Sequence, residues 1–240
     1  MKQQVSRLFT VPAPQTVVVN TMAGGVTANQ ISLTFDTPNG NQPNDFGNEV
    51  WIWQSGNQIP WTSAGKSQAI KVNTPSGDVS FTGLDVTTLS YIIGYAVGPK
   101  GDKTWPYPNV VASVFVPAIG GSPALEADNQ QQGDVFSPSI GVQTFGSTSL
   151  VMNYKMLGGY NPALSNSYVG VWEGENAFYT LAPKWYAPIT SQNSSGTISI
   201  NNIKILRGTS YTMGLFASGY DANPSNLKQT ALAAVSTFQV

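Results

Sequence analysis

Short apolar stretches separated by turn residues run along the whole chain, and they form two similar sets. The most prominent stretch, residues 90–98 (Ser-Tyr-Ile-Ile-Gly-Tyr-Ala-Val-Gly), has a counterpart at 210–219 (Ser-Tyr-Thr-Met-Gly-Leu-Phe-Ala-Ser-Gly). Both stretches have the length of a β-strand, contain many β-forming residues and end at a glycine. A similarity at this distance predicts that the same domain occurs twice.

The neighbouring positions predict the other strands of each repeat. Ile31, Leu33 and Phe35 alternate with polar residues, as in a strand with one buried face, and Leu150–Tyr154 repeats this pattern. The polar segment 36–49 is expected to be a loop, and neither repeat contains a convincing amphipathic helix. The remaining expected strands are 16–20, 50–54, 78–82 and 110–116 in the first repeat, and 169–173, 197–201 and 233–240 in the second, whose first strand is expected near 135–136.

About seven short strands in roughly 110 residues are typical of an immunoglobulin-like β-sandwich, here without its cysteine pair. The sequence therefore predicts an all-β chain of two tandem sandwiches. We expect residues 1–118 to form the first repeat, the Gly-, Pro- and Gln-rich segment 119–133 to be a linker, and residues 134–240 to form the second repeat.

The same residues resemble fibronectin type III modules. Residues 32–38 (Ser-Leu-Thr-Phe-Asp-Thr-Pro) are similar to the second strand of that family, although Phe35, and Tyr154 in the second repeat, stand where tryptophan is usual. Residues 81–85 followed by 90–97 resemble the family's sixth strand and the turn before it. The resemblance implies that Tyr91 and Tyr211 point inward and bond to the backbone of the preceding turn, as a tyrosine corner.

Composition excludes several kinds of chemistry. The chain has no His and no Cys, which excludes disulfides, thiol chemistry, Cys/His zinc sites and histidine-based acid–base catalysis. The Asp and Glu residues are scattered over loops, with no spacing typical of a calcium or a catalytic carboxylate site. We therefore expect a non-enzymatic protein with no catalytic residues, no metal site and no cofactor.

Charge narrows the range of partners. Only 10% of the residues are charged and the formal net charge is −1, so the surface tolerates self-association. Eleven Lys and Arg residues spread over the chain argue against nucleic-acid binding. No apolar run is long enough to span a membrane, and residues 1–10 lack the apolar core of a secretory signal. The chain is expected to be cytoplasmic or exported by a signal-independent route.

Aromatic residues are the candidate binding groups. Trp51 and Trp53 share one face of a strand whose other face, Val50 and Ile52, is also apolar. Such a strand needs cover on both faces, either from elsewhere in the chain or from a partner. Exposed rings in loops suit carbohydrate or protein partners. The predicted binding residues are Trp51, Trp53, Trp61, Trp105, Tyr107, Trp185 and Tyr186.

Three functions fit these patterns. The leading hypothesis is a non-enzymatic binding or assembly module that contacts a protein partner or a second copy of itself. A carbohydrate-binding protein that uses Trp105, Tyr107 and Trp185 is the second. A subunit of an exported toxin or phage-like particle is the third, suggested by the low charge and the absence of a cleavable signal.

Overall fold

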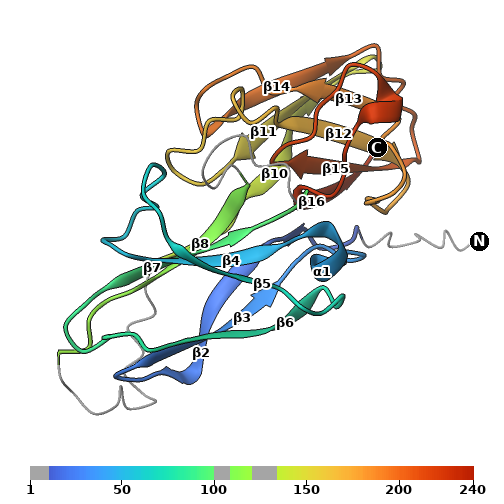
Figure 1. Cartoon of the computed structure of the whole chain (residues 1–240). Helices are drawn as coiled ribbons and strands as arrows, with labels where there is room; N and C mark the ends of the chain where they lie inside the picture. The colour runs from blue at the N-terminus through green and yellow to red at the C-terminus, as the bar shows by residue number, and fades with distance from the viewer. Residues whose placement is uncertain (1–10, 100–108, 121–133) are drawn as a thin grey trace, which may run out of the picture.

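The computed structural model describes residues 11–99, 109–120 and 134–240, and within these residues the chain forms two β-sandwiches (Figure 1). The first, blue to green, lies at the lower left of Figure 1, and the second, yellow to red, lies at the upper right. Helical structure in the described residues is limited to α1 (Pro43–Phe46) and the single 3₁₀ turn η1 (Pro224–Asn226). The predicted all-β fold class is confirmed.

The sandwich of the first repeat packs a small sheet against a larger one. In the described residues the small sheet has the order β2-β3-β6 and the larger sheet has the order β5-β4-β7-β8-β9, with all pairs antiparallel. The bounds are β2 (Val18–Val26), β3 (Gln30–Asp36), β4 (Glu49–Gln54), β5 (Lys66–Ala69), β6 (Ser76–Thr82), β7 (Tyr91–Ala96), β8 (Val110–Val116) and β9 (Val135–Phe136).

The sandwich of the second repeat has the same strand order. Its described sheets run β10-β11-β14 and β13-β12-β15-β16-β1. The bounds are β10 (Ser139–Phe145), β11 (Ser149–Lys155), β12 (Tyr168–Glu173), β13 (Trp185–Pro188), β14 (Ser195–Asn201), β15 (Ser210–Phe216), β16 (Leu232–Gln239) and β1 (Gln15–Thr16). The internal repeat seen in the sequence is therefore a repeat of structure.

Alternation along the strands builds each core. Leu33 and Phe35 of β3 are buried opposite Val50 and Ile52 of β4 in one continuous apolar cluster. Phe35, which stands at the family's tryptophan position, is 3% exposed and lies 5.4 Å from the ring of Tyr95. The period-2 pattern thus correctly identified the inward-facing positions.

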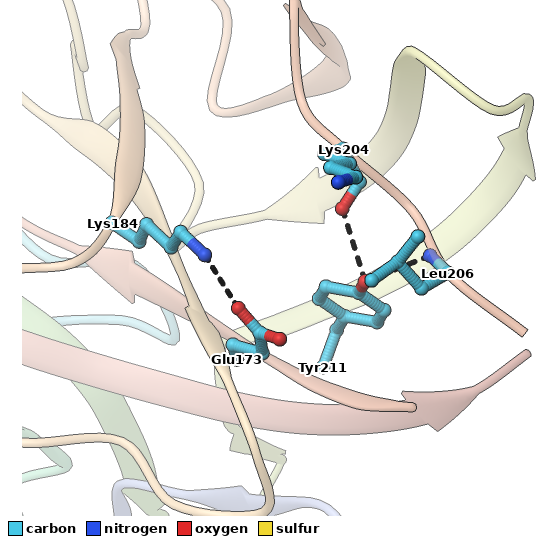
Figure 2. Close-up of polar contacts among 5 residues, drawn as sticks. All are labelled: Glu173, Lys184, Lys204, Leu206 and Tyr211. Carbon is cyan, nitrogen blue, oxygen red and sulfur yellow. Dashed lines mark hydrogen bonds and ion pairs between the residues drawn. The ribbon is translucent and has the colours of Figure 1, made fainter. Parts of the chain in front are cut away.

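Both expected tyrosine corners are present. The Tyr91 hydroxyl accepts a hydrogen bond from the backbone N–H of Asp85 at 3.1 Å. The Tyr211 hydroxyl accepts from Leu206 N–H at 2.9 Å and donates to the Lys204 carbonyl at 3.0 Å (Figure 2). These corners, together with the strand order, confirm the fibronectin type III-like architecture of the two repeats.

The two sandwiches exchange their first short strands. β1 comes just before the first sandwich in the chain but pairs with β16 of the second, through Gln15 with Val235 and Thr16 with Ala234. Conversely, β9 comes just before β10 but pairs with β8 of the first sandwich. The chain crosses from one sandwich to the other at Val17, whose N–H donates to the Ala233 carbonyl at 2.9 Å. Each large sheet is therefore completed by a strand from the other repeat.

This exchange corrects two predictions about the strands. The single strand expected over 16–20 is divided between β1 and β2, because the chain changes sheets at Val17. The residues at 135–136 form a strand, but it belongs to the first sandwich, and β10 is the strand that begins the second. Strand pairing thus connects the two predicted repeats, 1–118 and 134–240. The bounds of these repeats as domains stay a prediction.

The segment 36–49 was expected to be a loop, yet it contains α1. Pro43 stands at the start of this helix. Gly47 ends it at φ +75°, and the Gly47 backbone N–H donates to the Pro43 carbonyl. Proline at the first turn and a left-handed glycine just after the last turn are the usual ends of a helix. The prediction was wrong here because a four-residue helix is too short to give a periodic apolar pattern.

Candidate functional site

The outer face of the larger sheet of the first sandwich is apolar and covered. Trp51 and Trp53 of β4 stack there with ring centroids 6.0 Å apart. Trp53 is only 3% exposed, and its indole N–H donates to the Ser63 carbonyl at 3.2 Å. Leu157 and Phe136 of the second repeat join the same apolar cluster. Of the two expected kinds of cover, an intramolecular interface is therefore present.

Trp61 carries this interface onto the second sandwich. Its indole N–H donates to the Gly158 carbonyl at 3.0 Å, and its ring meets Tyr160 edge-on at 5.8 Å. The adjacent Gly159 has φ +80°, and a Cβ built there would lie 2.5 Å from the Trp61 indole nitrogen. Only glycine satisfies both the left-handed backbone and the close approach of the ring.

The second repeat makes the reciprocal contact. Tyr179 lies against the first sandwich, where its hydroxyl donates to the Pro38 carbonyl at 3.4 Å and its ring stacks on Phe46 at 5.3 Å. Beside it, Gly40 has φ +87°, in the position that Gly159 holds in the other repeat. An aromatic side chain from each repeat thus packs beside a left-handed glycine of the other, and burial raises the pKa of Tyr179 well above its ordinary value.

Trp185 and Tyr186 lie away from this interface, on β13 at the edge of the second large sheet. Both are partly buried. The Lys184 ammonium sits 4.6 Å from the centre of the Trp185 ring and pairs with Glu173 at 2.5 Å (Figure 2). The Tyr186 hydroxyl donates to the Ala222 carbonyl at 3.1 Å. These rings are held in place by contacts within their own repeat.

The predicted binding residues therefore fall into separate groups. Trp51, Trp53 and Trp61 gather at the junction of the sandwiches, Trp185 and Tyr186 lie on β13, and Trp105 and Tyr107 lie outside the described residues. Contact of any of these seven with an outside ligand stays a prediction.

Sequence reasoning missed the residues of the second repeat that complete the interface. Leu157, Tyr160 and Tyr179 were assigned no such role, although all three are buried there. A signal was present, because Gly40 and Gly159 occupy equivalent positions next to polar turns. Glycines needed for φ above zero cannot be told from ordinary turn glycines without the backbone.

Titratable groups offer little chemistry in the described residues. There, no cluster of three or more acidic side chains is arranged to hold a metal ion. Burial raises the pKa of Tyr95, Tyr160 and Tyr168 far above that of a free phenol. No helix in the part of the chain that the structure describes is both long and apolar enough to span a bilayer.

Comparisons with known proteins add a structural likeness. No protein-family model matches the chain, and no curated protein matches it. Among solved structures, the chain is similar to the FN1-FN3 domains of chicken CNTN1, with 12% sequence identity and a TM-score of 0.27. The match covers 95% of this chain and 65% of the length of that one. The assignment of a fibronectin type III-like architecture rests on the strand order and the two tyrosine corners of this chain.

Proposed function

We propose that this protein is a non-enzymatic binding module whose two sandwiches act as one rigid body toward a protein partner or a second copy of the chain. The observation that carries the proposal is the exchange of β1 and β9, because it joins both large sheets across the junction. Rigid surfaces that are organised before binding lose little conformational entropy on association. The chain also lacks His and Cys, the side chains most often used as catalytic base and thiol nucleophile.

Solution mass and small-angle scattering on the full chain test this proposal. We expect one compact particle whose scattering fits the arrangement in Figure 1, with both sandwiches in fixed orientation. A particle with freely moving sandwiches would contradict the proposal. A hydrolase screen with ester, peptide and glycoside substrates provides the second test, because turnover abolished by a single point variant would make the protein an enzyme.

The mass also separates the two kinds of partner. A stable dimer or larger ring favours an assembly role, including that of a subunit in an exported toxin or phage-like particle. A monomer at all concentrations favours a separate protein partner, since the outer face around Trp51 is already covered from within the chain. The carbohydrate alternative depends on Trp105, Tyr107 and Trp185, and glycan-dependent quenching of tryptophan fluorescence tests it.

A further inference from the structure

The two repeats differ at the first residue of the short edge strand in each large sheet. In the first repeat Lys66 begins β5 and pairs with Ile52 of β4, and in the second Trp185 begins β13 and pairs with Val171 of β12. Residues directly opposite each other in an antiparallel pair project from the same face. Because Ile52 and Val171 are buried in the cores, Lys66 and Trp185 both lie on the inner face of their sheets.

In the second repeat, the Trp185 side chain completes the margin of the core. It packs against the apolar core cluster, and its ring centre lies 6.3 Å from that of the corner tyrosine, Tyr211. The next inward-facing residue of β13, Ala187, packs against the same cluster. The edge strand of the second sandwich therefore covers its core with apolar side chains.

In the first repeat, the corresponding place is a hollow of about 300 Å³. Its lining includes Ile52, Lys66, Leu84 and Tyr91, the corner tyrosine of this repeat. Leu84 is partly exposed and Lys66 is exposed, so the hollow opens to solvent. The space that the Trp185 ring occupies in one sandwich is therefore open in the other.

The two repeats also differ in charge at this place. In the second repeat the cation above the Trp185 ring, Lys184, pairs with Glu173 (Figure 2). In the first repeat Gln54 stands at the position of Glu173, since each is paired with its corner tyrosine. The Lys66 ammonium, at the rim of the hollow, has no hydrogen bond or ion pair within the described part of the chain. The first repeat thus lacks both the ring and the carboxylate that the second repeat has.

We propose that this hollow receives an aromatic side chain of a separate protein partner, next to a carboxylate of that partner. The ring takes the place that Trp185 holds in the second repeat, and the carboxylate pairs with the Lys66 ammonium. Buried aromatic anchors of this kind supply much of the affinity of protein interfaces. The inference rests on the proposed binding function and names the chemistry of the partner. Because the site belongs to one sandwich, its failure would leave the rigid two-sandwich module standing, and freely moving sandwiches would leave the site standing.

Nuclear magnetic resonance on the isotope-labelled full chain tests the site. The probe is the blocked dipeptide acetyl-Glu-Trp-amide, and acetyl-Glu-Ala-amide is the probe without a ring. We expect the first to cause saturable shifts of the backbone amides of Lys66 and Leu84, and the second to cause none. Lys66→Met keeps the hollow and removes the charge, so it is expected to weaken the binding about two- to fivefold, as for an exposed ion pair.

Lys66→Trp gives the first repeat the residue of the second. We expect it to fill the hollow, to abolish binding of the Trp dipeptide and to raise the urea midpoint. Ser67→Trp is the matched control, because Ser67 pairs with Trp51 and projects from the outer face of β5, so the affinity stays unchanged.

Three results would overturn the proposal. The first is the absence of saturable shifts with the Trp dipeptide, or equal affinity for the dipeptide without a ring. The second is undiminished binding of the Trp dipeptide to Lys66→Trp. The third is self-association of the unaltered chain that Lys66→Trp abolishes, which would assign the hollow to a second copy and not to a separate partner.

Discussion

Substitution of Gly159 by alanine tests the contact between the two sandwiches directly. Gly159 has φ +80°, a conformation that costs alanine about 1–2 kcal/mol. The new Cβ would also lie 2.5 Å from the Trp61 indole nitrogen, so the ring must move. Moving it breaks the hydrogen bond to Gly158, worth about 1 kcal/mol. It also removes part of the ring's packing, where complete loss of a buried tryptophan costs about 3–5 kcal/mol.

Gly208→Ala is the control for the cost of placing alanine in the left-handed backbone conformation. Gly208 has φ +73°, and nothing lies within 4 Å of a Cβ built on it. We expect Gly208→Ala to lower the free energy of unfolding by about 1–2 kcal/mol and Gly159→Ala by about 3–5 kcal/mol. Urea unfolding followed by far-ultraviolet circular dichroism measures both. Equal losses in the two variants would show that Trp61 contributes nothing at the junction and would refute the reasoning.

Three further predictions concern stability. Tyr211→Phe removes both hydrogen bonds of its corner and should lower the free energy of unfolding in urea by about 2 kcal/mol. Tyr91→Phe removes one hydrogen bond and should lower it by about half as much. A larger loss in Tyr91→Phe than in Tyr211→Phe would contradict the geometry. Glu173→Gln should change the free energy of unfolding by less than about 0.5 kcal/mol, because the Lys184–Glu173 pair is exposed. A loss above about 1 kcal/mol would be inconsistent with a surface ion pair. Burial raises the pKa of four tyrosines above the unfolded value of about 10. Their contribution to stability is therefore complete below pH ~10 and is lost as the pH rises from there through their folded pKa values. Equal urea midpoints at pH ~8 and pH ~11 would disprove this prediction. These tyrosines are Tyr95, Tyr160, Tyr168 and Tyr179.

The sequence was sufficient for those strands whose two faces differ clearly in burial. The alternation of Ile31, Leu33 and Phe35 identified β3 and its buried face, and the final apolar run after Ala231 was correctly assigned to a strand. The tyrosine corners were also predictable, since they depend on a local turn of a few residues. Edge strands β5 and β13 were not predicted. In β5 every residue is exposed, which leaves no apolar pattern to read.

The exchange between the repeats could not be predicted for a different reason. β1 and β9 have two residues each, which is too few to show periodicity. In addition, an alternating pattern indicates which face of a strand is buried but not which strand pairs with it. Thr16 pairs with Ala234, more than two hundred positions away, and no local sequence pattern indicates such a pairing. The apolar outer face of β4 did indicate cover, and only the structure could assign that cover to Leu157 and Phe136.

Native-state hydrogen exchange at the amide of Val17 is the most direct test of the account. This N–H donates to the Ala233 carbonyl at the point where the chain crosses between sandwiches, and Val17 itself is fully buried. If the exchange of strands joins the repeats into one unit, its opening free energy should match that of the amides in β16. Exchange at the rate of an unstructured peptide, with β16 still protected, would mean that the sandwiches are not joined in this way.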